Sequence, residues 1–143
     1  NSNLSIGDKM AEEIKIGVGS AVPVEDELTM MVKGRDHLTG LPRSIEIGTN
    51  EVVRAIGKEL RTMVAAIKDV LQETPPELAA DIIDNGITLT GGTSQLRNLA
   101  ELIYRRTGVK ARVAKDAPFC VAKGTGEAIK HLDTYKKAII SKR

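Results

Sequence analysis

Two adjacent glycines, Gly91 and Gly92, with the Thr93 that follows them, form the first candidate for a ligand site. The apolar stretch 87–90 before them predicts a strand, and the stretch 95–107 after them predicts a helix. Glycine has no Cβ, so a planar ligand can lie directly against the backbone there. The first N–H groups of a helix are free and carry a partial positive charge. α/β folds bind nucleotides at strand–glycine–helix units of this kind.

The same residues also have a purely structural interpretation. A tight turn between strand and helix, with Thr93 or Ser94 as the helix cap, would use the same residue types. No Gly-Lys-[Ser/Thr] follows the glycines, so this is not a Walker phosphate loop. On this motif alone, the structural interpretation is at least as good as the ligand site.

A second candidate is the pair Glu12 and Lys15 in a predicted helix over residues 8–16. The two residues are three positions apart and therefore share a helix face. Such a pair could bracket an adenine amino group and a ribose hydroxyl. A solvated ion pair worth roughly 0.2–0.5 kcal/mol is the simpler alternative, and without further context it is favoured.

The remaining candidates are weaker. Gly124 and Gly126 give half of a dinucleotide-binding pattern, but Ile129 holds the position of its last glycine, and close packing against the 91–94 turn is the better explanation. The two histidines lie in unrelated segments and no CxxC or HxxxH spacing exists, so we expect no metal site. Cys120 is expected to be a small buried apolar residue rather than a nucleophile.

The elements that must position these residues follow from periodicity. Apolar residues recur about every 3.6 residues from position 52 to 71, which predicts a long helix capped by Thr49 or Asn50. Gly57 allows a break into two helices. Pro76 suits the first turn of the next helix, which ends before Gly86.

Strands alternate with these helices on both sides. The stretches 27–33 and 41–47 predict a β-hairpin around the turn residues Gly34 and Gly40. After the turn at 91–94 and its helix, a strand over 109–114 and a helix over 118–132 complete a parallel strand pair with covering helices. We expect the basic tail, 133–143, to be helical or frayed.

Composition excludes several classes of function. The chain has 143 residues, a net charge of +2 and a single cysteine, which fit one soluble domain of ordinary size in a reducing cytoplasm. The small net charge and the scarcity of aromatic residues give no case for nucleic-acid binding. No apolar run of about 20 residues is present, so we expect no direct membrane insertion.

The order of the segments carries more information than any one motif. The sequence runs through GDKMAEEIKIGVGSA, VKGRDHLTGLPRSIEI, ETPPELAADIIDNGITLTGGTSQLRNL and DAPFCVAKGTGEA. This order resembles the C-terminal portion of MreB-type bacterial actins, within the superfamily of actin, heat-shock ATPases and sugar kinases. The hairpin motif GRD..TGLPR argues against a chaperone or sugar-kinase relative.

The resemblance implies an α/β fold in two parts. Residues 1–57 would form a small α+β subdomain that carries the β-hairpin. Residues 58–143 would form part of an actin-like (ribonuclease H-like) large subdomain with its C-terminal helix. The cofactor would be ATP, with Mg²⁺ in the intact protein but no metal ligand from this chain.

The resemblance also assigns the site. In the superfamily the glycine turn packs against adenosine, which implies Gly91, Gly92 and Thr93, and a Glu and a Lys lie near adenine and ribose, which implies Glu12 and Lys15. MreB proteins usually have a third glycine at the turn, whereas this chain has Thr93, as actin and the heat-shock ATPases have Ser or Thr there. A divergent MreB paralogue would fit this difference.

The family's Asp/Gly-rich phosphate hairpins (DxGxxx) are missing, and the chain does not begin with Met. We therefore expect a fragment without ATP turnover of its own and with an exposed sheet edge. That edge would pair in filaments or in strand-exchanged oligomers. The alternative is a non-catalytic interaction module that docks to membrane-linked shape proteins, where the basic tail could contact acidic partners.

Overall fold

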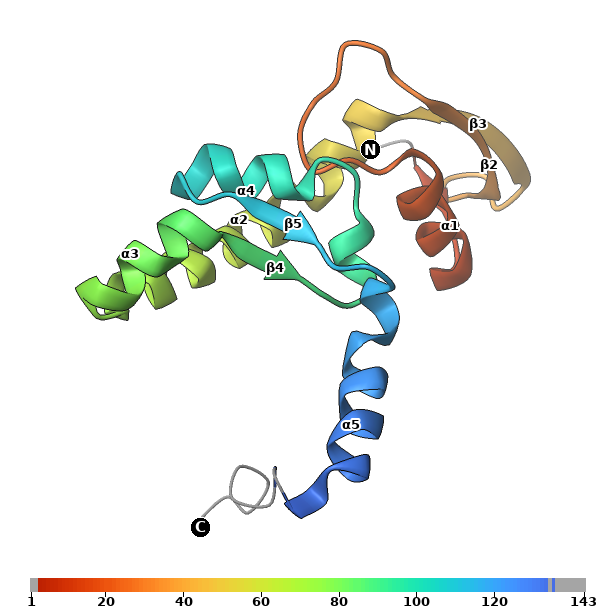
Figure 1. Cartoon of the computed structure of the whole chain (residues 1–143). Helices are drawn as coiled ribbons and strands as arrows, with labels where there is room; N and C mark the ends of the chain where they lie inside the picture. The colour runs from red at the N-terminus through yellow and green to blue at the C-terminus, as the bar shows by residue number, and fades with distance from the viewer. Residues whose placement is uncertain (1–2, 134, 136–143) are drawn as a thin grey trace.

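The first part of the molecule is a small sheet covered by one helix. A computed structural model describes residues 3–133 and 135. Strands β1 (Leu4–Ser5), β2 (Thr29–Asp36) and β3 (Pro42–Gly48) pair antiparallel in the order β1-β2-β3. Helix α1 (Asp8–Val18) lies against this sheet at the right of Figure 1. Together with Val52 of the following helix, they bury a cluster of Ile14, Val18 and Val32.

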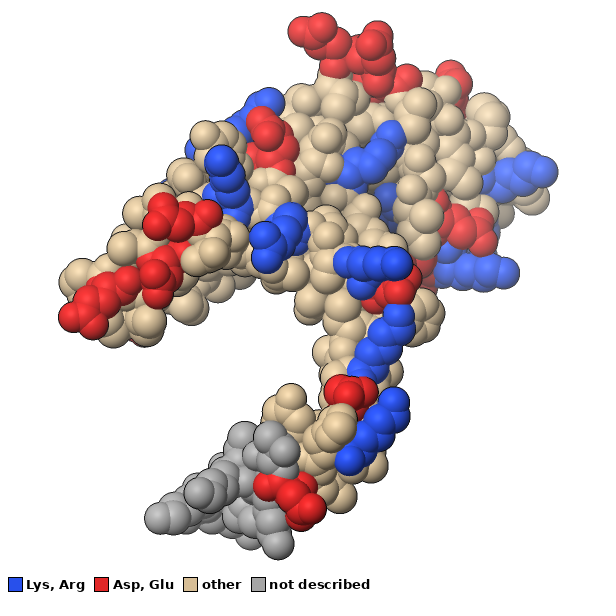
Figure 2. Space-filling view, in the orientation of Figure 1, with Lys and Arg blue, Asp and Glu red and all other residues tan. Residues whose placement is uncertain are grey.

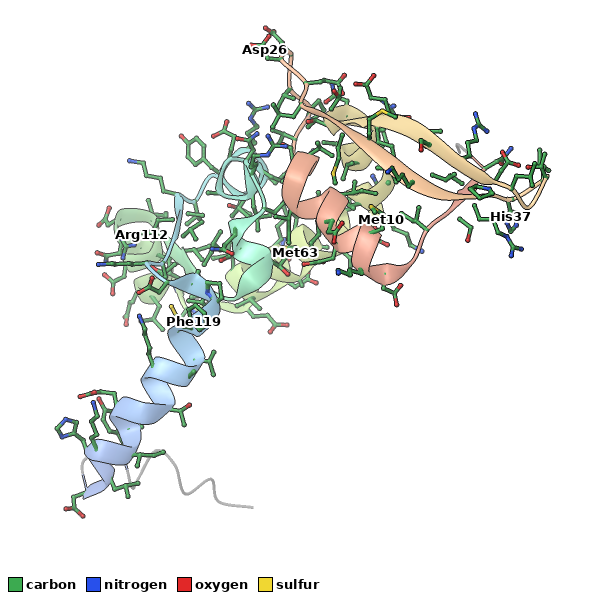
Figure 3. All side chains as sticks on the ribbon, turned by 90° about the vertical axis from the view of Figure 1, so that its right-hand side faces the viewer. Met10, Asp26, His37, Met63, Arg112 and Phe119 are labelled. Atoms are coloured by element: carbon green, nitrogen blue, oxygen red, sulfur yellow. The ribbon has the colours of Figure 1, made fainter. Side chains whose placement is uncertain are left out.

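The predicted hairpin is present, but β2 runs further than predicted. Its pairing with β3 extends from Thr29 opposite Gly48 to Arg35 opposite Pro42, so only residues 37–41 form the turn. Asp36 explains this extension, because its carboxylate accepts a hydrogen bond from the Thr39 amide (2.9 Å) and pairs with the Arg43 guanidinium (2.9 Å). These two interactions are the main causes that lower the pKa of Asp36 to about 2. His37 marks the hairpin tip in Figure 3.

Helix α2 (Thr49–Glu73) joins the two parts of the molecule without a break. The break that Gly57 would have allowed does not occur, because apolar side chains on both sides of it pack continuously. The predicted caps are also wrong, since Thr49 and Asn50 lie inside the helix. Their side chains instead hold the preceding loop: the Thr49 hydroxyl donates to the Leu28 carbonyl (3.2 Å), and the Asn50 amide donates to the Val24 carbonyl (2.9 Å).

The second part is built around two short parallel strands. After α3 (Pro76–Asn85), β4 (Ile87–Leu89) pairs with β5 (Ala111–Val113), and α4 (Leu99–Thr107) connects them. The predicted parallel pair and its crossover helix are therefore confirmed. A second cluster, Ala21, Leu60, Leu99 and Ile103, lies between α2, α4 and this sheet.

Helix α4 begins later than predicted, and this changes the turn before it. Residues Gly92–Gln95 form a 3-10 turn, η1, rather than the start of the helix. Asn98 is left-handed (φ 60°), which separates η1 from α4. Thr93 and Ser94 therefore do not cap α4, and the Ser94 hydroxyl donates back to the Gly91 carbonyl (2.6 Å).

Helix α5 (Cys120–Lys130) follows a short 3-10 turn, η2 (Ala117–Phe119), and projects away from the rest of the molecule (Figures 1 and 3). It is helical through Gly124 and Gly126, where an added Cβ would meet nothing within 4 Å. The predicted close packing of these glycines against the 91–94 turn is therefore wrong for the described residues. Cys120 at the start of α5 is half-buried rather than fully buried.

Three further expectations concern the chain as a whole. The division at residue 57 stays a prediction, because α2 passes through it and Ile56 contacts both hydrophobic clusters. Among the described residues, no helix is both long and apolar enough to cross a membrane. The predicted helical or frayed tail falls mostly on residues 134 and 136–143, which lie outside the described part of the chain.

Candidate functional site

A pocket of about 330 Å³ separates α1 from the turn η1. Figure 1 shows the two elements that line it, the red helix α1 and the teal turn that precedes α4. Its two walls come from segments about 80 residues apart in the sequence. The lining residues are Glu12, Lys15, Ile16, Gly19, Gly92, Thr93, Gln95, Leu96 and Arg97.

The structure thus brings four of the five predicted site residues together. Glu12 and Lys15 stand on the α1 wall, and Gly92 and Thr93 on the opposite wall. Gly91 is not a lining residue, but it shapes the turn. Its φ of 86° favours glycine, and its amide donates to the Ala117 carbonyl at 2.8 Å. Gly91 therefore has a backbone role, whereas Gly92 faces the pocket.

The α1 wall carries the pocket's acidic group and one of its cations. The Lys15 ammonium and a Glu12 carboxylate oxygen are 2.5 Å apart, as the predicted ion pair requires. The Lys15 side chain is 38% exposed and that of Glu12 56% exposed, so both remain accessible to a ligand. The ion-pair interpretation and the ligand interpretation are therefore compatible.

The η1 wall is open to close approach. A Cβ built on Gly92 would meet no atom within 4 Å, so nothing in the chain fills the space next to this backbone. The absence of a side chain lets a flat ligand contact the peptide plane. Because α4 starts only at Leu99, its N-terminus does not supply the predicted free N–H groups at Gly92 and Thr93.

Five hydrogen-bonding residues join the two walls of the pocket. Arg97 Nε donates to the Gly19 carbonyl (2.9 Å), and the Arg97 carbonyl accepts from the Ala21 amide (2.8 Å). The Asn98 side-chain amide donates to the hydroxyl of Ser20 (3.0 Å), which is fully buried. We call residues 19–21 with Arg97 and Asn98 the latch. It sets the spacing between α1 and η1.

Gly19 belongs to both the latch and the pocket. An added Cβ would lie 2.2 Å from the Lys15 carbonyl oxygen and 3.1 Å from Leu96 Cδ1. A side chain there would therefore push α1 away from η1. Gly19 also marks the end of α1, which stops next to it at Val18.

The pocket has the chemistry of a binding site. It contains one carboxylate, Glu12, and two cations, Lys15 and Arg97, and its lining has no histidine or cysteine. Among the described residues, no group of His, Cys, Asp and Glu side chains could hold a metal ion. These groups can hydrogen-bond a polar ligand and attract an anionic one.

Comparisons with known proteins agree with this fold. The family model described as MreB/Mbl protein matches residues 1–137. The chain is 40% identical to the cell shape-determining protein MreB of Escherichia coli K12, over 91% of this chain and 38% of that protein. It is also 40% identical to the cell shape-determining protein Mbl of Bacillus subtilis 168, over 96% of this chain and 41% of that protein.

Solved structures give the same result. MreB5 of Spiroplasma citri bound to ADP superposes with a TM-score of 0.87 and 32% identity, over 94% of this chain and 41% of that one. The same protein bound to AMPPNP gives a TM-score of 0.86 over 95% of this chain. The fold therefore defines the class as bacterial actin-like.

More narrowly, the chain belongs to the MreB/Mbl family, as the order of its segments predicted. It spans about two fifths of the length of the relatives it matches, from 38% to 41%.

Proposed function

We propose that this chain supplies the adenosine side of the ATP site in a bacterial actin-like filament protein. The observation that carries the proposal is the single pocket formed by Glu12 and Lys15 on one wall and by Gly92 and Thr93 on the other. The resemblance assigned adenosine contacts to these residues, which lie in two distant segments. Their convergence on one pocket supports a shared ligand.

The pocket fits the part of the nucleotide assigned to it. A volume of about 330 Å³ is at the lower end for small-molecule sites, roughly 300–1,000 Å³. The open backbone at Gly92 suits a planar base or a ribose ring. Glu12 could accept hydrogen bonds from an amino or hydroxyl group, and Lys15 and Arg97 could attract the anionic end of the ligand.

The intact protein would be a cell-shape cytoskeletal ATPase that works in the cytoplasm as a filament. Relatives named cell shape-determining proteins and solved relatives bound to ADP and AMPPNP support this extension. Mg²⁺ and the phosphate contacts would come from segments outside these 143 residues. The chain by itself should therefore show no ATP turnover.

Assembly is the second part of the proposal. In the described residues β4 and β5 pair only with each other, so each has an edge without a strand partner. Unpaired edges are templates for strand addition. We expect these edges to pair with a further strand in filaments or in strand-exchanged oligomers. A monodisperse monomer in analytical ultracentrifugation would contradict the oligomers expected of the chain itself.

Calorimetry with ATP tests the nucleotide site. Gly92→Asp should weaken binding by at least about tenfold, because a side chain and a negative charge would occupy the ligand's place. The chain itself has room for that side chain, so folding should be unaffected. Gly126→Asp, on exposed α5, is the matched control and should bind normally. Unchanged affinity in Gly92→Asp would overturn the site.

A second candidate function is a non-catalytic docking module for membrane-linked shape proteins. A basic groove between α2 and α4, which shares no lining residue with the nucleotide pocket, favours it. Docking without nucleotide binding would then be the chain's main role. A chain that fails to bind ATP but still binds a protein partner would support this candidate over the first.

A further inference from the structure

A second cavity in the described part of the chain is a groove between α2 and α4. It has a volume of about 760 Å³ and shares no lining residue with the nucleotide pocket. Its walls are α2 and α4, and residues 21–23 close one end. The proposed nucleotide site does not use this groove.

The rim of the groove is strongly basic. Arg54, Arg61 and Lys68 stand on α2, and Arg105 and Arg106 stand on α4. No acidic residue lines the groove. Arg105 pairs with Glu101 (2.7 Å), whereas the other four cations make no ion pair within residues 3–133 and 135. The groove therefore presents uncompensated positive charge.

The α2 cations are regularly spaced. Arg54, Arg61 and Lys68 are seven residues apart, so they lie on one helix face at intervals of roughly 10.5 Å. A second helix lying along α2 would place its own side chains at the same intervals. The spacing therefore matches a helical partner with acidic residues two turns apart.

The floor of the groove is apolar and recessed. Leu60, Val64 and Val22 line it and are buried, and Leu102 contributes from α4. Gly57 lies among them in the middle of α2. Its missing side chain keeps this part of the groove open, since a Cβ would meet only the end of Arg61, at 3.4 Å. A glycine inside a helix costs about 1 kcal/mol relative to alanine.

We propose that this groove binds an acidic amphipathic helix of a protein partner. Apolar side chains of the partner would fill the floor, and its carboxylates would pair with the cations of the rim. A flat membrane could reach the rim but not the recessed floor. Nucleic acid is disfavoured because no aromatic side chain lines the groove for base stacking. The proposal gives the second candidate function its surface and is independent of ATP binding.

Fluorescence anisotropy with the whole chain tests the proposal. The probe is a labelled synthetic peptide of roughly 18 residues, five helical turns, with leucines along one face and glutamates elsewhere. We expect saturable binding that falls at least about tenfold for Arg61→Glu with Lys68→Glu. The matched control, Lys110→Glu with Arg112→Glu, makes the same charge change outside the groove and should leave binding unchanged.

A third variant separates groove filling from folding. Gly57→Leu puts a side chain into the groove and should weaken binding of the acidic peptide at least about tenfold. The melting temperature of the protein should not fall, because leucine is a better helix former than glycine. ATP affinity should be unchanged in all these variants. A result that contradicts the groove proposal can therefore be told apart from one that contradicts the nucleotide site.

Three results would overturn the proposal. The first is no binding of the acidic peptide, and the second is binding that these groove variants leave intact. The third is binding of another probe as tight as that of the acidic peptide and equally weakened by the groove variants. A glutamine-substituted peptide, phosphatidylglycerol vesicles and a single-stranded oligonucleotide are the probes to compare, and such a result would assign the groove to another ligand.

Discussion

The region around the β2–β3 hairpin buries its core within the chain, whereas the region around β4 and β5 does so only in part. Strand β2 is paired on both sides, and Val32 at its centre is fully buried. Within the described residues, the second sheet has two strands of three residues each. Its neighbouring helices α3 and α5 contain no buried residue.

Both regions expose large apolar side chains, and in the hairpin region Ile16, Met31, Leu38 and Leu41 are each more than half exposed. On α3, α5 and the turn before α5, five large apolar side chains are more than half exposed: Leu78, Ile83, Phe119, Val121 and Ile129. Figure 2 shows acidic side chains over the outer end of α3 and both basic and acidic ones along α5. The two regions therefore differ in how their sheets are paired and in how much core their helices bury, and α3 and α5 have apolar surface available for further segments or partners.

This comparison predicts that a destabilising substitution in one region leaves the other region folded. The largest loss of stability should come from Ile103→Ala. Ile103 is fully buried in the second cluster. We expect a loss of about 2–5 kcal/mol in the free energy of unfolding, measured with urea. Hydrogen exchange should show lost protection in α4 and β5 but retained protection in β2 and β3.

Val32→Ala is the reciprocal change in the hairpin region. Hydrogen-exchange protection should fall first in β2 and β3. The loss in the free energy of unfolding should be smaller than for Ile103→Ala, because fewer atoms are removed. Equal loss of protection in both regions from either variant would show that the chain is one cooperative unit. The distinction between a hairpin region that buries its core within the chain and a β4–β5 region that does so only in part would then fail.

Gly19→Ala tests the junction between the regions and should have the next largest effect. The new Cβ would collide with the Lys15 carbonyl oxygen, a backbone atom that cannot move cheaply. We expect a loss of about 1–3 kcal/mol by thermal unfolding. Gly17→Ala is the control, since its Cβ would contact only the flexible Met30 side chain, at 3.3 Å. Equal effects in the two variants would contradict the steric role of Gly19.

Arg97→Ala tests the same junction from the η1 wall. It removes the hydrogen bond to the Gly19 carbonyl and should cost about 1 kcal/mol of stability. The informative readout is ligand affinity: ATP should bind more weakly than this small loss explains, because the two walls of the pocket lose their fixed spacing. Normal ATP affinity in a folded Arg97→Ala protein would limit the latch to a structural role.

The smallest effect should be confined to the hairpin tip and to acidic pH. The folded pKa of Asp36, about 2, lies below its ordinary value of 3.8. Its contribution to stability is therefore complete above about pH 4 and is lost as the pH falls towards 2. NMR of the Leu38 and Thr39 amides should follow this titration, and Asp36→Asn should abolish it. A wild-type titration at the ordinary pKa would contradict the observed hydrogen bonds.

The sequence predicted those elements whose signal is local. Helices α2 and α3 follow from apolar periodicity and Pro76, and the parallel pair follows from the alternation of strands and helices. The errors occur where distant residues compete with local preference. Thr49 and Asn50 bond to residues 24–28 instead of capping α2, and the latch holds Arg97 and Asn98 outside α4.

The candidate site divides in the same way. Glu12, Lys15, Gly92 and Thr93 could be named because their motifs resemble those of a known family. Arg97 and Gly19 could not, since their contact spans 78 residues and neither residue belongs to a local binding motif. A glycine at a helix end and an arginine in a turn are ordinary surface features until the fold brings them together.

The most direct test of the adenosine site is an NMR titration of the whole chain with ADP, which follows the backbone amides of both regions. We expect the largest shift changes in residues 12–19 and 92–97, on the two walls of the pocket, and none at the hairpin tip around His37. Gly92→Asp should abolish the changes on both walls together. Shift changes restricted to one wall, or unaltered by Gly92→Asp, would contradict a nucleotide site built between α1 and η1.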